Sequence, residues 1–126
     1  MRYSLPRAMF RMNLAPGYAD PAVVTDTLVD RYYDMMLAPG IRGAVIARMK
    51  QTVLQDPVPL LRGIRAPTLI IWGQQDAMIP SANAADYRRA LPDSKLVLLA
   101  GTGHLPHEEA PSVSVEPLKA FLSVTK

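Results

Sequence analysis

The sequence contains no cysteine, and only two of its 126 residues are histidines. A disulfide framework and cysteine-based zinc sites are therefore excluded, and two imidazoles are too few for a His-rich metal site, so we expect no metal and no cofactor. No apolar run approaches the length of a membrane span, and residues 1–14 alternate arginine with apolar residues instead of forming the apolar centre of a signal peptide. We expect a cytoplasmic protein.

Basic residues form no run either. The formal net charge is +3, but the lysines and arginines are scattered among apolar residues without interleaved aromatic side chains, so we expect solvated surfaces and no nucleic-acid binding. With 49% hydrophobic and 20% charged residues, the chain is globular, and its length suits one small domain or part of one.

The central feature that is present is an apolar run at residues 69–72. Pro67 stands at the first position of this strand, where a missing N–H is tolerated, and the absence of polar alternation favours a parallel strand covered on both faces. Gly73 ends the run, and Asp76 follows in the loop beyond the carboxyl end, where open α/β sheets place ligands and catalytic groups. Asp76 is therefore the first functional candidate.

A second apolar run at residues 95–99 follows a helical stretch at 81–90, and the loop after it contains His104. A right-handed crossover makes two such strands parallel and places their following loops at one end of the sheet. We therefore expect the Asp76 carboxylate and the His104 imidazole to meet at hydrogen-bond distance, about 2.6–3.2 Å.

The two segments read Pro-Thr-Leu-Ile-Ile-Trp-Gly-Gln-Gln-Asp and Gly-Thr-Gly-His-Leu-Pro-His-Glu-Glu-Ala-Pro. With these motifs, residues 64–122 resemble the C-terminal part of the α/β-hydrolase superfamily, whose triad runs nucleophile, acid, histidine along the chain. The resemblance implies an α/β fold, here a C-terminal fragment with a helical cap region, two parallel strands and flanking helices. It also implies that Asp76 is the triad acid and His104 the triad base.

The nucleophile of such a triad is missing from the sequence. No pair of the seven glycines lies four apart around a Ser, Asp or Cys, so there is no nucleophile elbow, and no His-Gly-Gly-Gly oxyanion loop occurs. We expect the nucleophile on a missing N-terminal half of a longer or truncated hydrolase. An in-frame Gly-x-Ser-x-Gly in the DNA upstream of Met1 would indicate a truncated enzyme, whereas a stop codon and a ribosome-binding site would indicate a short protein.

Residues 1–56 form the predicted helical cap, or lid, and residues 57–126 the predicted core part. Thr25 caps a helix that begins at Asp26 and ends at residues 38–40, with one apolar face at helical spacing. A lid of this kind suits small hydrophobic substrates, although helix-bundle core is an equally open reading of its Met and aromatic side chains. The residues expected to contact substrate are Tyr32, Met35, Met36, Met78 and Ile79.

Residues outside these motifs are given structural roles. We expect a helix at 6–14 and another at 41–55, the latter with an apolar face formed by Val45, Ile46, Met49 and Val53. A last helix should start at residue 116 or 117, because Pro117 cannot lie deep inside a helix without removing a hydrogen bond. Trp72 is expected in the core. Surface positions without assigned chemistry are His107, Glu108 and Glu109.

Two classes of function follow. The first is acyl transfer by a serine esterase or lipase-like hydrolase acting on small hydrophobic substrates, in which this chain supplies acid and base; an Asp nucleophile would instead indicate an epoxide hydrolase or a dehalogenase. The second is a catalytically inactive interaction module that binds a partner through its apolar helices. Because two strands leave both sheet edges unpaired, we also expect self-association.

Overall fold

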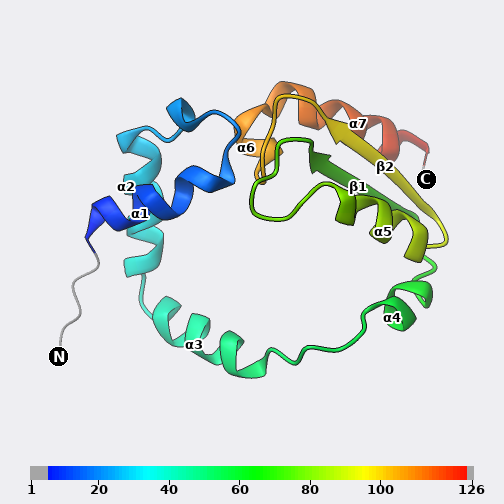
Figure 1. Ribbon diagram of the computed structural model, residues 1–126, viewed down its shortest axis with the longest axis horizontal. Helices are drawn as coiled ribbons and strands as arrows, with labels where there is room; N and C mark the ends of the chain where they lie inside the picture. Colours follow the sequence, from blue (N-terminus) through cyan, green and yellow to red (C-terminus); the bar gives the residue numbers. More distant parts are fainter. Residues whose placement is uncertain (1–5, 125–126) are drawn as a thin grey trace.

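The computed structural model describes residues 6–124, which form two parallel strands with helices around them (Figure 1). Residues 1–5, the start of the predicted cap, lie outside the described residues. The strands are β1 (Thr68–Gly73) and β2 (Ser94–Leu99). The helices are α1 (Arg7–Leu14), α2 (Asp26–Leu37), α3 (Ile41–Gln51), α4 (Val58–Arg62), α5 (Ala82–Ala90), α6 (Pro106–Glu109) and α7 (Pro111–Val124). Two short 3₁₀ helices, η1 (Ala15–Gly17) and η2 (Pro21–Val23), connect α1 to α2.

The N-terminal helices begin largely where the sequence predicts. The Thr25 hydroxyl accepts a hydrogen bond from the Leu28 amide at 3.2 Å and so caps α2. Between α1 and α2, Tyr18, Val24 and Val29 form a buried cluster. This cluster holds the first two helices against the loop that follows β2, because Leu105 of that loop packs on it.

Helix α3 ends at Gln51, earlier than the predicted end at residue 55. The next residue, Thr52, has an extended backbone, and it is followed by a second β-branched residue, which disfavours continuation of a helix. The expected apolar face of α3 is also unpacked, since Met49 is 72% exposed. Without tertiary packing a short helix gains little from lengthening.

The sheet has the predicted parallel arrangement. Residues pair from Thr68 with Ser94 to Gly73 with Leu99, and α5 forms the crossover between the strands. Helices α5 and α7 both contact the sheet and lie on opposite sides of it (Figure 1). Accordingly, the Trp72 ring lies 5.9 Å from the ring of Tyr87 on α5, whereas Ile71 shares a cavity with residues of α7. Both faces of β1 are therefore covered, although its apolar side chains are only half-buried.

Helix α7 begins at Pro111, so the predicted start at residue 116 or 117 is wrong. Proline suits the first turn of a helix, where its missing N–H has no partner to lose, and the Ser114 amide donates to the Ala110 carbonyl at 2.9 Å to close that turn. Pro117 lies inside the helix and removes one backbone hydrogen bond. The prediction overestimated that cost, because α7 packs on both strands of the sheet and these contacts keep the helix continuous.

The chain as a whole leaves much of its surface uncovered. The accessible surface is 9130 Å², whereas a compact monomer of this mass exposes about 6,600 Å². Large apolar side chains are exposed on α3 and on the segment after it, including Val53 at 76% and Leu54 at 96%. Among residues 6–124 no helix is long and apolar enough to cross a membrane.

The purified chain is expected to self-associate. Each strand has one neighbour within residues 6–124, so the outer edges of β1 and β2 carry backbone donors and acceptors free to pair with another chain, beside exposed apolar side chains. Multi-angle light scattering should give masses above that of one chain, and a hydrophobic dye should bind and fluoresce. A monodisperse monomer that unfolds cooperatively and binds no dye would contradict this expectation.

Candidate active site

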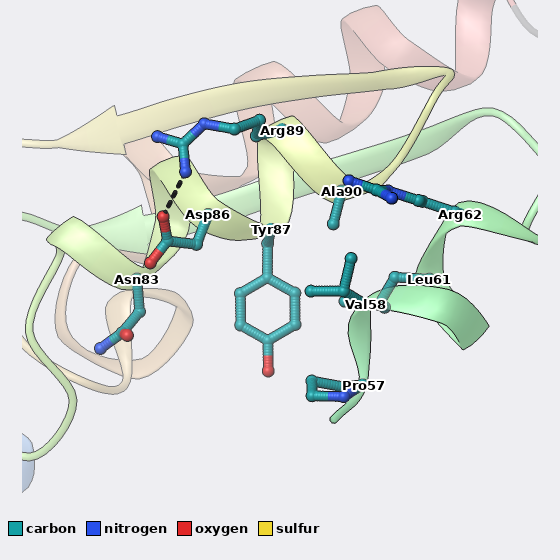
Figure 2. A pocket seen from close by; sticks show the side chains of 9 residues that line it. All are labelled: Pro57, Val58, Leu61, Arg62, Asn83, Asp86, Tyr87, Arg89 and Ala90. Atoms are coloured by element: carbon teal, nitrogen blue, oxygen red, sulfur yellow. Dashed lines mark hydrogen bonds and ion pairs between the residues drawn. The ribbon is translucent and has the colours of Figure 1, made fainter. Parts of the chain in front are cut away.

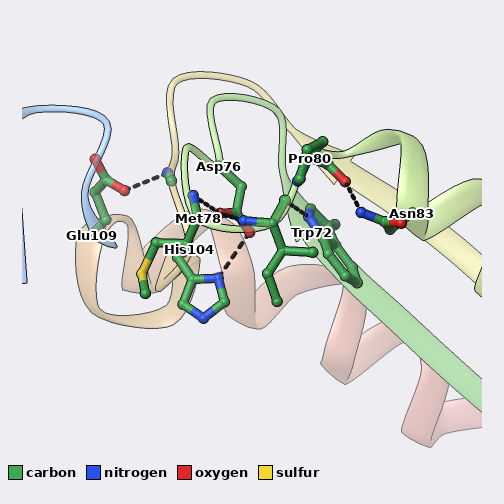
Figure 3. A network of polar contacts seen from close by, with 9 residues as sticks. Trp72, Asp76, Met78, Pro80, Asn83, His104 and Glu109 are labelled. Carbon is green, nitrogen blue, oxygen red and sulfur yellow. Dashed lines mark hydrogen bonds and ion pairs between the residues drawn. The ribbon is translucent and has the colours of Figure 1, made fainter. Parts of the chain in front are cut away.

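Asp76 and His104 meet at the carboxyl end of the sheet. His104 Nδ1 lies 2.9 Å from Asp76 Oδ2, within the expected hydrogen-bond range, although the two residues are 28 positions apart (Figure 3). The Asp76 side chain is only 3% exposed, whereas that of His104 is 32% exposed. The pair thus combines a buried acid with an imidazole that solvent or a substrate can reach.

The loop after β1 holds the Asp76 carboxylate in place. Its Oδ1 accepts hydrogen bonds from the backbone amides of Met78 and Ile79, each at 2.9 Å, and its Oδ2 faces His104. Burial alone would raise the pKa of Asp76, but the Ile79 amide, the His104 imidazole and the Met78 amide stabilise the carboxylate and bring its pKa below the ordinary value. Asp76 is therefore held ionised, as an orienting acid needs to be.

Two glycines make room for the loop that carries His104. A Cβ atom on Gly73 would lie 2.0 Å from the Gly103 carbonyl oxygen, and a Cβ on Gly103 would lie 2.7 Å from the Ala19 amide nitrogen. On its other side the loop is bound to η1, because the amides of His104 and Leu105 both donate to the Gly17 carbonyl, at 2.9 and 3.3 Å. His104 is thus placed by backbone contacts from two directions.

A small cavity of about 170 Å³ borders the pair and is lined by Ile71, Trp72, Gly73, Asp76, His104 and Pro106. Trp72, predicted as core, therefore also faces this space. Met78 and Ile79 lie next to Asp76 but contribute their amides to it, and their side chains are exposed. None of Tyr32, Met35 and Met36 lines the cavity. Substrate contact by these five residues stays a prediction.

A larger cavity, of about 460 Å³, lies between α4 and α5, away from Asp76 and His104 (Figure 2). Tyr87 and Ala90 line it together with Arg89, which is paired with Asp86 at 2.7 Å. It contains no histidine and no pair of groups suited to proton transfer. Among residues 6–124 no three His, Asp or Glu side chains are grouped so as to hold a metal ion.

Glu108 and Glu109 are not the solvated residues that the sequence suggests. The Glu108 carboxylate accepts hydrogen bonds from the hydroxyls of Tyr18, at 2.6 Å, and Tyr32, at 3.1 Å, and pairs with Arg31 at 2.8 Å. Burial acts to raise the pKa of Glu108, but these hydrogen bonds and the arginine lower it below its ordinary value. Burial, reinforced by Glu108, raises the pKa of the Tyr18 hydroxyl.

Replacing Gly73 or Gly103 with Ala should destabilise the fold by about 1–3 kcal/mol or more, since each new methyl group would overlap backbone atoms that cannot move aside easily. Gly43 is the matched control, because it lies inside α3 with no atom within 4 Å of its added Cβ, so Gly43→Ala should stabilise by about 0.5–1 kcal/mol. Urea unfolding of the three variants measures the difference. Equal midpoints would show that the two loop glycines are not tightly enclosed.

Replacing Asp76 with Asn should remove a pH-dependent part of the stability. Since folding lowers the pKa of Asp76, the ionised group stabilises the fold fully above the unfolded pKa of about 3.9, and this contribution is lost as the pH falls through the folded pKa. The free energy of unfolding of Asp76→Asn should therefore lie below that of the wild type at pH 7, and the gap should shrink as the pH falls below about 4. A gap that is constant with pH would contradict the assignment.

The sequence and the fold were compared with those of known proteins. The sequence model of the alpha/beta hydrolase fold family matches residues 5–111. The 2-(acetamidomethylene)succinate hydrolase of Mesorhizobium japonicum is 27% identical over 86 residues, which cover 68% of this chain and 31% of that protein. A serine hydrolase involved in carbazole degradation superposes with a TM-score of 0.83 at 22% identity, over 98% of this chain and 50% of that one.

A meta-cleavage product hydrolase from Pseudomonas fluorescens IP01 gives a TM-score of 0.82 at 18% identity, over 98% of this chain and 48% of that one. At such identities the likeness of the structures shows the fold alone. The chain spans about half the length of these solved structures and less than a third of the curated relative. Because the family match extends over most of the sequence, from before α1 to the start of α7, the chain belongs to the α/β-hydrolase family and represents a fragment of its fold.

Proposed function

We propose that this chain provides the acid and the base of a serine-hydrolase triad whose nucleophile comes from a polypeptide segment outside these 126 residues. The observation that carries the proposal is the 2.9 Å contact between His104 Nδ1 and Asp76 Oδ2. Nucleophilic catalysis needs a base that is oriented by a third group and open on its other side. Within residues 6–124 the imidazole makes its side-chain hydrogen bond through Nδ1, and the ring borders the small cavity.

The chemistry follows from the two ring nitrogens. With Asp76 accepting the Nδ1 proton, the neutral imidazole carries its lone pair on Nε2. Nε2 takes the proton of the hydroxyl nucleophile as the oxygen attacks the carbonyl carbon, and then returns it to the leaving alcohol as the acyl–enzyme forms. Asp76 stabilises the imidazolium between these two transfers. Water repeats the same proton transfers to release the acid.

The lining of the cavity supports a small apolar substrate. Ile71, Trp72 and Pro106 present apolar surface next to His104. A second cavity of about 470 Å³, which shares Ile71, His104 and Pro106 with the first, adds Val115 and Leu118. An apolar acyl group fits these surroundings better than a charged one, because burial of an unpaired charge is costly. The proteins compared above are hydrolases, which also supports hydrolysis as the reaction class.

A second candidate, an interaction module without catalysis, is favoured by the exposed apolar residues of α3 and the segment after it. Ile46, Met49 and Leu54 are all exposed, and patches of this kind commonly bind other proteins. In that case the Asp76–His104 pair would be dispensable. The two candidates differ in what His104→Ala does: in the first it abolishes catalysis once a nucleophile segment completes the triad, and in the second it leaves partner binding unchanged.

The chain by itself should not hydrolyse p-nitrophenyl butyrate above background. The acid and the base alone can at best activate water, and the donors that stabilise the tetrahedral intermediate, often the largest catalytic contribution, are missing with the oxyanion loop. Wild type and His104→Ala should therefore give the same rate. A saturable rate that is lost in His104→Ala would show that a serine of this chain acts as the nucleophile.

A chimera tests the proposal directly. The half of the carbazole-pathway hydrolase that this chain does not match would be joined to the chain, giving one polypeptide with a nucleophile segment. It should hydrolyse the butyrate ester, and His104→Ala should lower kcat by at least about a thousandfold, with Asp76→Asn lowering it by a comparable factor. A chimera that unfolds cooperatively yet shows no His104-dependent rate would refute the proposed function.

A further inference from the structure

Glu109, at the end of α6, is bound to backbone amides on two separate segments. Its Oε1 accepts from the amides of Ala19, at 2.7 Å, and Asp20, at 3.1 Å, which lie about ninety positions earlier in the chain. Its Oε2 accepts from the Gly103 amide at 2.6 Å. Figure 3 shows the carboxylate reaching the loop that carries His104. Three N–H donors thus converge on one ionisable side chain.

These contacts fix the residue directly before His104. Gly103 lies against the Tyr18–Ala19 backbone with no room for a side chain, and the next amide, that of His104, donates to the Gly17 carbonyl at 2.9 Å. The turn at residues 17–20 and the His104 loop therefore touch along their backbones. The Glu109 carboxylate joins the two by accepting hydrogen bonds from both.

A carboxylate is the group that this junction requires. Both of its oxygens accept, and hydrogen bonds to an ionised acceptor are roughly twice as strong as those between neutral groups. A glutamine in the same place would offer one oxygen and one NH₂ group, so it would point a donor at either Gly103 or the Ala19–Asp20 pair. The chemistry of the site is thus specific to Glu at this position.

We propose that Glu109 is a positioning residue for His104, which locks the Gly103 amide to the 17–20 turn and so holds the imidazole within reach of Asp76. The proposal deepens the proposed function, because it rests on His104 acting as the base. It also makes the helical N-terminal segment part of the site. The turn between α1 and α2 packs against the loop that carries His104, and Glu109 binds the backbone amides of both.

The adjacent carboxylate, Glu108, serves as the matched control. It lies on the same helix, carries the same charge and binds the same N-terminal segment, but its partners are the side chains of Tyr18, Arg31 and Tyr32. None of these hydrogen bonds is made to Gly103 or His104: Tyr18 binds Glu108 through its hydroxyl, whereas it is the Tyr18 backbone that packs against Gly103. A variant at Glu108 therefore loosens the helical segment without releasing the amide next to the base.

The test is the NMR signature of the His104 ring in the full chain. With only two histidines in the sequence, long-range ¹H–¹⁵N spectra of wild type and His104→Ala assign each ring, and His107 serves as the internal reference. Glu109→Gln should lose the Nδ1–H signal of His104 and change its tautomer pattern, while His107 stays as it is. Glu108→Gln should leave the His104 signal unchanged, whereas the neighbouring His107 ring can respond to the lost charge. Circular dichroism confirms that each variant is folded.

Each other outcome is decisive. If Glu109→Gln keeps the His104 signal, or if Glu108→Gln loses it equally, the positioning role is refuted. If Glu109→Gln does not fold, hydrogen exchange of the wild-type amides decides. The Gly103 and Ala19 amides should be protected from exchange, and conditions that expose them should also remove the Nδ1–H signal of His104. Unprotected amides together with a persistent Nδ1–H signal would overturn the proposal. If Asp76→Asn leaves the His104 signal unchanged, the acid–base pair itself fails, whatever Glu109 does.

Discussion

The arrangement depends on one close approach of backbone to backbone, at Gly103. One side of this residue meets the end of β1, where a side chain on Gly73 would overlap the Gly103 carbonyl, and the other side meets the turn that follows α1. Because β1 and β2 pair in parallel, the ends of both strands deliver their loops to this place. The same contact therefore sets the distance between Asp76 and His104 and the attachment of the N-terminal helices.

The sequence carried enough information to predict the two strands and the acid–base pair, because that information is local. Apolar runs without polar alternation, ended by Gly73 in one case, indicate parallel strands, and the crossover rule then brings the two following loops together. The ends of helices depend on more distant contacts. The predicted start of α7 was wrong because its packing on the sheet outweighs the cost of Pro117 inside the helix. The predicted end of α3 was wrong because its apolar face has no packing partner that would extend the helix.

The roles of Glu108 and Glu109 could not be predicted from sequence. Acidic residues before a helix are most often solvated. The N-terminal partners of both carboxylates lie 76 to 90 positions away, and no spacing rule connects them; only Gly103 is near in sequence, six positions from Glu109. For Glu109 these partners are main-chain amides, which leave no trace in residue identity. Tyr32 is a second example of a contact that the sequence does not predict. Its position on an apolar helix face suggests substrate contact, but in the structure its hydroxyl donates a hydrogen bond to Glu108.

The contacts of the acid lie close together in the sequence, whereas the hydrophobic core draws on distant parts of the chain. Every hydrogen bond that the Asp76 carboxylate accepts from the described residues comes from residues 78, 79 and 104, so the contacts of the acid lie within two loops, whereas His104 is also held by the 17–20 turn. The hydrophobic core is not local in this way, and the fragment exposes about 2,500 Å² more than a compact chain of its mass. In such a fragment the accuracy of the site cannot come from a large core. It comes from glycine contacts that admit a single backbone path and from one carboxylate that accepts three amides.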